Sequence, residues 1–150
     1  MSALTKETRM QRAGYALESA LERTGEGATL VVEGKKDTIA LEKFGFSKDS
    51  IFEINRGWDL DKVATFLWEN YPRLAKDGAP SVILFMDWDR TGGKLQADLK
   101  RRLESLDQPV DESLRKELSV SLSSEIKCVE DIVAFKETIE MASGIHFLGN

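Results

Sequence analysis

The 150-residue sequence contains one cysteine, one histidine and three prolines. The single cysteine, Cys128, rules out an internal disulfide framework, and we take it to exclude a cysteine-based zinc site. The lone histidine, His146, is near the C-terminus and is not expected to be catalytic. No apolar run is long enough to cross a bilayer, and the polar first twelve residues do not resemble a secretory signal. These absences predict a cytoplasmic protein without a membrane partner.

The composition is 41% hydrophobic and 31% charged, which suits one soluble domain over residues 1–150. The net charge of −5 argues against a protein that coats nucleic acid non-specifically, because such binding depends on neutralising phosphates. A nucleic-acid enzyme remains compatible with this charge, since local basic patches can guide a phosphate backbone. Such patches occur at 35–36, 90–94 and 100–102. The alternative for each of them is a solvated helix surface.

Short apolar runs alternate along the chain with segments of helical periodicity. Strands are expected at 28–33, 50–55, 81–87 and 108–111, and helices at 10–23, 37–44, 59–71, 92–106, 112–122 and 125–142. Apolar strands that alternate with helices predict a parallel sheet covered on both faces. The expected fold is therefore α/β and Rossmann-like, with three layers and a central, mainly parallel four-stranded sheet. Its motif-bearing core spans about 28–111, with one helix before it and further helices after it.

Three carboxylates come at the ends of predicted strands. Glu33 ends the first strand, Asp87 ends the third, and Asp89 follows two positions later. Side chains alternate along an extended segment, so Asp87 and Asp89 project to the same side and Trp88 to the other. Ligand sites in open α/β sheets lie at the carboxyl ends of the strands. If the first and third strands are neighbours, Glu33 approaches the aspartate pair.

Clustered carboxylates need compensation, because two like charges about 5 Å apart repel by roughly 3 kcal/mol at an effective dielectric of about 20. A bound Mg²⁺ is the favoured remedy, with Mn²⁺ as an alternative, since oxygen ligands suit such hard ions. The competing interpretation is that acidic residues after strands merely cap helices or initiate turns. The adjacent Gly34 and Gly92-Gly93 favour the site, because glycine lets the backbone turn sharply or lets a phosphate come close.

At these residues the sequence resembles the Toprim domain of topoisomerases, bacterial-type primases and several nucleases. The segment VVEGKKD (31–37) matches its Glu-Gly motif, ILFMDWDRTGG (83–93) matches its Asp-x-Asp motif, and Gly57 follows the second strand as in the family. The resemblance implies that Glu33 is a general acid/base and that Asp87 and Asp89 hold Mg²⁺, with Glu33 as a further candidate ligand.

The details of the match favour some branches of that family over others. Thr91 and Gly93 replace the acidic residues that are usual in topoisomerases, which brings the motif closer to primases and maturases. A topoisomerase would also need a DNA-clasping domain. The whole chain is similar to small stand-alone Toprim proteins found mainly in archaea, including the segment 125–131. Lys127, Glu130 and Asp131 of that segment either approach the site or form a charged first helical turn.

Further residues near the strand ends are candidates for contacts with phosphate or nucleic acid: Gly34, Lys35, Lys36, Arg56, Gly57, Arg90, Gly92 and Lys94. Arg56 either contacts a phosphate or pairs with Asp87. Among the tryptophans, Trp58 is the best exposed candidate for stacking on bases, and Trp68 is assigned to the core.

The leading hypothesis is a Mg²⁺-dependent nuclease or nucleotidyl transferase that acts on RNA or DNA. The alternative is a non-catalytic module that binds a nucleotide or nucleic acid within a larger complex. A protein partner or a second copy of the chain is left open. A phosphoacceptor receiver domain also gathers acids at strand ends, but its pattern fits the Glu-Gly and Asp-x-Asp motifs poorly.

Overall fold

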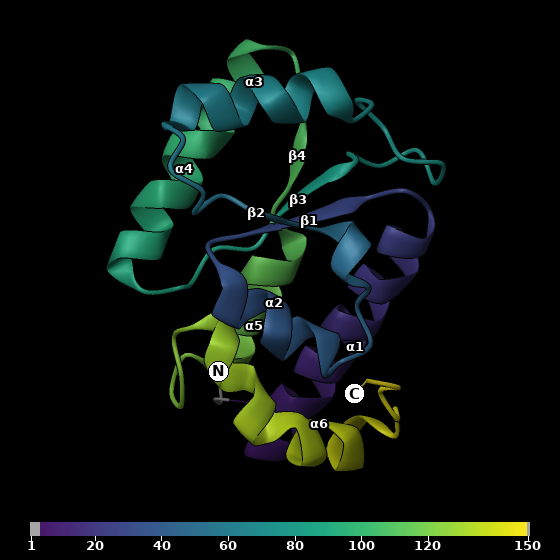
Figure 1. Ribbon diagram of the computed structural model, residues 1–150. Coiled ribbons are helices and arrows are strands. Elements are labelled where there is room, and N and C mark those ends of the chain that lie inside the picture. The colour runs from purple at the N-terminus through teal and green to yellow at the C-terminus, as the bar shows by residue number, and fades with distance from the viewer. Residues whose placement is uncertain (1–3, 150) are drawn as a thin grey trace.

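The computed structural model describes residues 4–149, and its helices and strands alternate along most of the chain (Figure 1). The order is α1 (Lys6–Gly25), β1 (Thr29–Val32), α2 (Lys35–Glu42), the 3₁₀ helix η1 (Lys48–Ser50), β2 (Ile51–Glu53), α3 (Leu60–Asn70), β3 (Val82–Leu84), α4 (Arg90–Ser105), β4 (Val110–Asp111), α5 (Ser113–Leu122), the 3₁₀ helix η2 (Val129–Phe135) and α6 (Lys136–Ser143). No described helix is long and apolar enough to span a membrane.

The strands form one four-stranded sheet in the order β2-β1-β3-β4, and every pairing is parallel. This confirms the predicted α/β class with a parallel sheet between helices. It also makes β1 and β3 neighbours, with Val31 of β1 in register with Leu84 of β3. Both strands therefore reach the same edge of the sheet at their carboxyl ends.

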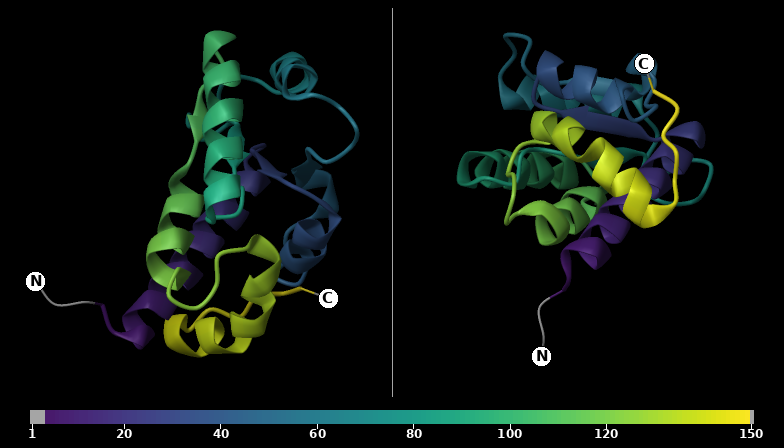
Figure 2. Two further views of the ribbon diagram at one scale, coloured as in Figure 1. Left: turned by 90° about the vertical axis from the view of Figure 1, so that its left-hand side faces the viewer. Right: turned by 90° about the horizontal axis from the view of Figure 1, so that it is seen from below.

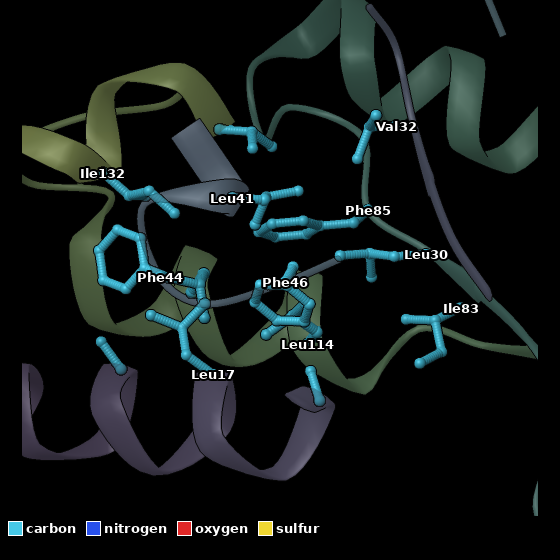
Figure 3. Packing of buried hydrophobic residues seen from close by; sticks show 14 of the residues in the cluster. Leu17, Leu30, Val32, Leu41, Phe44, Phe46, Ile83, Phe85, Leu114 and Ile132 are labelled. Carbon is cyan, nitrogen blue, oxygen red and sulfur yellow. The ribbon is translucent and has the colours of Figure 1, made fainter. Parts of the chain in front are cut away.

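Both faces of the sheet are apolar, because successive strand side chains alternate between them. Leu30 and Ile83 join a cluster with α1, α2, α5 and η2, whereas Val31 and Leu84 join a second cluster with α3 and α4. Figure 3 shows the first cluster, in which strand side chains meet Leu17 of α1 and Leu114 of α5. The sheet is thus held between two helical layers, which fixes its carboxyl edge as a rigid platform.

The C-terminal segment differs from its prediction. A continuous helix over 125–142 was expected, but residues 126–128 are non-helical, residues 129–135 form η2, and α6 begins only at Lys136. The cause is Trp88, whose main-chain N–H and indole Nε1 donate to the carbonyls of Lys127 and Ile126, both at 2.8 Å. These carbonyls therefore bind Trp88 rather than N–H groups of a continuing helix, and Cys128 after them is extended. From there η2 packs on α2 and α6 packs on α1 (Figure 2).

The assignment of Trp68 to the core was also wrong. Helix α3 buries the face that contains Val63, Ala64 and Leu67, and Trp68 comes one residue later. One residue turns the side chain by about 100° around a helix of 3.6 residues per turn. Trp68 is therefore 47% exposed. Trp88, in contrast, is buried against the ring of Phe85, as its position opposite the aspartates predicts.

Candidate metal centre at the carboxyl edge of the sheet

The three strand-end carboxylates lie together at one edge of the sheet. Glu33 directly follows β1, and the Phe85 N–H donates to the Val31 carbonyl at 2.8 Å, which continues the pairing beyond β3. Two residues further on, the Asp87 N–H donates to Oε2 of Glu33 at 2.9 Å. The neighbouring parallel strands thus bring Glu33 to Asp87, as the sequence pattern predicts.

Asp87 is fixed from both its side chain and its backbone. Its Oδ1 accepts the N–H of Val129 at 2.7 Å, at the start of η2. Its carbonyl accepts from Nε and Nη2 of Arg115 on α5, at 3.1 and 3.0 Å. Two elements from later parts of the chain therefore hold this residue, one through its carboxylate and the other through its carbonyl.

Asp89 is the N-cap of α4, and its Oδ1 accepts the N–H of Gly92 at 2.7 Å. Gly92 is needed here because a Cβ at this position would lie 2.1 Å from the Asp87 carbonyl oxygen. One ligand atom each from Asp87, Asp89 and Cys128 lie within 4.8 Å of one another, which is close enough to share an ion. The cap interaction does not consume the Asp89 side chain, since each carboxylate offers a second oxygen.

The clustered acids change the protonation chemistry of the site. Burial raises the pKa of Glu33 above its usual range, and the charge of Asp87 adds to the effect. Burial, followed by the charges of Asp87 and Glu130, raises the pKa of Asp37 to about 6. Burial and the charge of Asp87 raise the pKa of the Cys128 thiol to about 11. At neutral pH the thiol is therefore protonated, and the negative charges of the acidic side chains repel one another.

The raised pKa of Asp37 gives a pH-dependent stability prediction. Below about pH 4 the side chain is protonated in both the folded and unfolded states, and above about pH 6 burying its charge costs stability. The contribution of this group to stability is thus lost as pH rises from about 4 to 6. Asp37→Asn keeps an oxygen for the Gly34 N–H, which Asp37 now accepts at 3.0 Å. We expect this variant to unfold at a higher temperature than wild type at pH 7.5.

The measurement is thermal unfolding in EDTA at pH 3.5, 5.5 and 7.5. The advantage of Asp37→Asn should shrink as pH falls and vanish at pH 3.5. Asp49→Asn is the matched control, because Asp49 is exposed and precedes β2 at the opposite edge of the sheet. A variant less stable than wild type at pH 7.5 would mean that the bond to Gly34 outweighs the cost of the buried charge.

The other predicted contact residues surround this edge. Gly34 caps α2, Lys35 and Lys36 are exposed in its first turn, and Arg90 and Lys94 are exposed in the first turns of α4. Gly57 has a φ of +79°, which favours glycine. None of these lysines and arginines is in an ion pair among residues 4–149.

Arg56 does not pair with Asp87. Its guanidinium carbon lies 4.1 Å from the ring centroid of Phe52 and 5.2 Å from that of Trp58. Its Nε donates to the Glu53 carbonyl at 2.7 Å. The pairing alternative for Arg56 is therefore wrong, and its contact with a phosphate stays a prediction.

Sequence reasoning missed three contributors to the site: Asp37, Arg115 and Cys128. Cys128 was used only to exclude disulfides and a cysteine-based zinc site, yet its sulfur lies with the two aspartates. Two signals were available: Asp37 ends the motif VVEGKKD (31–37), and Cys128 lies in the segment 125–131. That segment does approach the site, through the Val129 N–H and the charges of Glu130 and Asp131. Arg115 sits in an ordinary amphipathic helix and carried no signal.

Comparison with known proteins finds archaeal relatives along most of the chain. It is 31% identical over 127 residues to a UPF0292 protein of Thermococcus onnurineus, covering 85% of this chain and 86% of the relative. It is 27% identical over 136 residues to a UPF0292 protein of Methanosarcina barkeri, covering 91% and 88%. A solved structure of a protein from Aquifex aeolicus matches with a TM-score of 0.62 and 26% identity, over 79% of this chain and 95% of that one. No known family model matches the chain.

Proposed function

The chain belongs to the UPF0292 protein family, and we propose that its strand-end carboxylates serve Mg²⁺-dependent phosphodiester chemistry on RNA or DNA, as a nuclease or nucleotidyl transferase. The motifs around Glu33, Asp87 and Asp89 support a Toprim-type site. The parallel sheet and the archaeal origin of the relatives are in keeping with the resemblance to small archaeal Toprim proteins.

One observation carries the proposal: each of the three carboxylates is anchored through one oxygen by a backbone N–H, and none is neutralised by a cationic side chain. Glu33 uses Oε2, Asp87 uses Oδ1 and Asp89 uses Oδ1, each accepting a backbone N–H. Within residues 4–149 no ion pair includes these side chains, and the carboxyl groups of Glu33 and Asp87 also contact each other. Carboxylates that are oriented by backbone N–H groups and not neutralised by a lysine or arginine are what a metal site requires.

The energetics favour a cation at this position. Like charges about 5 Å apart repel by roughly 3 kcal/mol at an effective dielectric of about 20. That is a large part of the roughly 5–15 kcal/mol that stabilises a domain. The nearest strong donor, Arg115, binds the Asp87 carbonyl rather than its carboxylate. A bound divalent ion would relieve the repulsion that the neighbouring side chains leave in place.

The residues present fit Mg²⁺ better than a soft metal. Asp87 and Asp89 would hold the ion through carboxylate oxygens, which hard cations prefer. Cys128 lies close enough to take part, but its raised pKa of about 11 keeps the sulfur protonated at neutral pH. When bound, Mg²⁺ polarises a phosphoryl oxygen and orients the attacking and leaving groups.

The protein's own groups supply the remaining chemistry. The raised pKa of Glu33 lets its carboxyl group hold and release a proton nearer to neutral pH than an exposed glutamate. This carboxyl group would exchange that proton with the attacking or leaving oxygen. Lys35 and Lys36, with Arg90 and Lys94, would bind flanking phosphates, since they are exposed and not engaged in ion pairs among the described residues.

The direct test is stabilisation by metal alone. Mg²⁺ at ten times its dissociation constant should stabilise the fold by about 1.4 kcal/mol, which raises the melting temperature by roughly 3–6 °C. Asp87→Asn should abolish this increment and raise the metal-free stability, because asparagine keeps an oxygen for the Val129 N–H but removes a charge. Thermal unfolding with and without Mg²⁺ measures both effects.

Asp49→Asn is again the matched control, since it removes an exposed charge at the opposite edge of the sheet. It should respond to Mg²⁺ like wild type. An equal Mg²⁺ response in Asp87→Asn would place the ion elsewhere on the molecule. No response in wild type would remove the metal centre from the proposal.

A further inference from the structure

A second feature at the same edge of the sheet is an aromatic cluster with two cations, in the segment from β2 into α3. Trp58 packs against Phe52 and Phe66, with ring centroids 6.4 and 5.4 Å apart. The Lys62 ammonium lies 4.6 Å from the Trp58 centroid, and the Arg56 guanidinium carbon lies 5.2 Å from it. We call these five residues the Trp58 cluster.

An open groove of about 350 Å³ runs beside this cluster on the outer side of α3. It is lined by Trp58, Asp61, Lys62, Thr65, Phe66 and Glu69. Asp61 forms an ion pair with Arg102, so its charge is already balanced. Arg56 and Lys62 are both exposed, and neither is in an ion pair among residues 4–149. The groove thus offers aromatic surface with Lys62, and the nearby Arg56, at its Trp58 end, whereas Glu69 carries a negative charge toward its other end.

The Arg56 side chain is held in a fixed position. Its Nε donates to the Glu53 carbonyl, and its plane lies over the ring of Phe52. Its terminal nitrogens have no hydrogen-bond partner within the described part of the chain. A guanidinium held in this way is oriented for a phosphate, which it can bind through two parallel N–H groups.

The Trp58 cluster is continuous with the carboxylates. The Asn55 N–H donates to the Glu33 carbonyl at 2.9 Å, which places the start of this loop beside the proposed catalytic group. The Cα of Trp58 lies at most about 11 Å from that of Asn55, because three peptide links separate them. Along a stacked strand that distance corresponds to about three nucleotides.

We propose that the groove beside Trp58 binds an unpaired base of a single-stranded nucleic acid whose reacting phosphodiester lies at Glu33, Asp87 and Asp89. Arg56 and Lys62 contact the phosphates between these two points. The inference rests on the proposed function and adds the substrate class. Bases in a duplex are stacked on one another, so only a single strand can offer a base to this groove.

The first test is binding of fluorescein-labelled 12-nucleotide single strands of RNA and of DNA, and of the matching duplexes, with Ca²⁺ in place of Mg²⁺. Fluorescence anisotropy should show single strands binding at least about tenfold more tightly than duplexes, the advantage one stacked base can give. Trp58→Ala should weaken single-strand binding by about tenfold. Comparison of the affinities for single-stranded RNA and single-stranded DNA shows whether ribose or deoxyribose is preferred.

Trp68→Ala is the matched control, since Trp68 is an exposed tryptophan nearer the other end of α3. Trp68 lies about 12 Å along the helix from Leu60, the first residue of α3 and the one nearer Trp58. Trp68→Ala should bind like wild type. Equal losses in the two tryptophan variants, or duplex binding as tight as single-strand binding, would overturn the proposal.

The charged residues give a test that leaves the aromatic packing intact. Arg56→Gln with Lys62→Gln should lower the slope of log affinity against log salt by about 1.4, because each lost contact with a single-strand phosphate removes about 0.7. Lys43→Gln with Lys48→Gln makes the same charge change in exposed side chains after α2 and before β2, away from the carboxyl edge. An unchanged slope in the first pair, or equal changes in both, contradicts the assignment.

Failure of this inference can be told from failure of the proposed function. If Mg²⁺ stabilises the protein and cleavage depends on Glu33, but Trp58→Ala binds single strands normally, the proposed function holds and the groove is not the binding site. If single strands bind in a Trp58-dependent way but are not cleaved, the groove is a binding site and the proposed catalytic function is wrong. Wild-type dimerisation that Trp58→Ala abolishes in sedimentation would assign the groove to a second copy of the chain and overturn the proposal.

Discussion

Glu33→Gln is expected to reduce Mg²⁺-dependent cleavage of nucleic acid by about 10²–10⁴-fold, the usual contribution of a general acid or base. Glutamine keeps an oxygen that can accept the Asp87 N–H, so the local backbone should stay in place. What it removes is a group that exchanges a proton. The raised pKa of Glu33, caused first by burial and then by Asp87, is suited to that exchange. A large loss of rate with unchanged stability would therefore assign the proton transfer to this side chain.

The assay uses end-labelled RNA and DNA with Mg²⁺ or Mn²⁺, and it compares initial rates at matched protein concentration. Glu53→Gln is the control, because Glu53 pairs in register with Val32 on the neighbouring strand and accepts from the Thr38 hydroxyl, outside the carboxylate cluster. It should cleave at the wild-type rate. Full activity in Glu33→Gln would exclude the acid/base role. Wild-type binding without turnover on every substrate would favour the non-catalytic binding module.

Gly92→Ala is expected to destabilise the fold by about 3 kcal/mol, and so to lower the melting temperature by roughly 6–12 °C. The new Cβ would lie 2.1 Å from the carbonyl oxygen of Asp87 and 2.7 Å from its carbonyl carbon. Both are backbone atoms, so no side-chain rotation relieves the overlap. The Asp87 carbonyl is in addition held by Arg115. Either α4 must move away from the strand end, or the two aspartates must separate.

Thermal and urea unfolding of Gly92→Ala measure this cost, and its response to Mg²⁺ measures the damage to the site. Gly25→Ala is the control, because Gly25 also belongs to a helix, α1, but a Cβ added there would have no atom within 4 Å. That variant should be more stable than wild type by about 0.5 kcal/mol, through the lower entropy of its unfolded chain. A Gly92→Ala protein as stable as wild type would mean that α4 shifts at little cost.

The surroundings of Gly92 also show which role this glycine has. The sequence predicts either a sharp backbone turn or a backbone that lets a phosphate come close, because the glycine follows two acidic residues in the Asp-x-Asp motif. In the fold the space that the missing side chain leaves is filled by the protein's own Asp87 carbonyl. The motif therefore brings the cap of α4 against the end of the strand segment, and Asp89 is oriented by that contact.

Much of the architecture could be predicted because it depends on local patterns. Apolar runs with helices between them predict a parallel sheet, and alternation along the third strand places Asp87 and Asp89 on one side and Trp88 on the other. Errors arose where distant groups override local preference. Residues 126–128 carry a helical pattern, yet Trp88 donates to the carbonyls of Ile126 and Lys127, and the helix does not continue there. Trp68 fits an apolar seam in the sequence but falls just outside the face that α3 buries.

The sequence by itself determined the parallel α/β fold and the strand-end position of Glu33, Asp87 and Asp89, because both follow from residue periodicity along single segments. Only the tertiary structure decided how these acids are held. The Val129 N–H, Arg115 and Cys128 reach Asp87 from 28 or more positions further along the chain, and no local pattern encodes such contacts. The same holds for Arg56, whose guanidinium lies against the rings of Phe52 and Trp58 instead of pairing with Asp87.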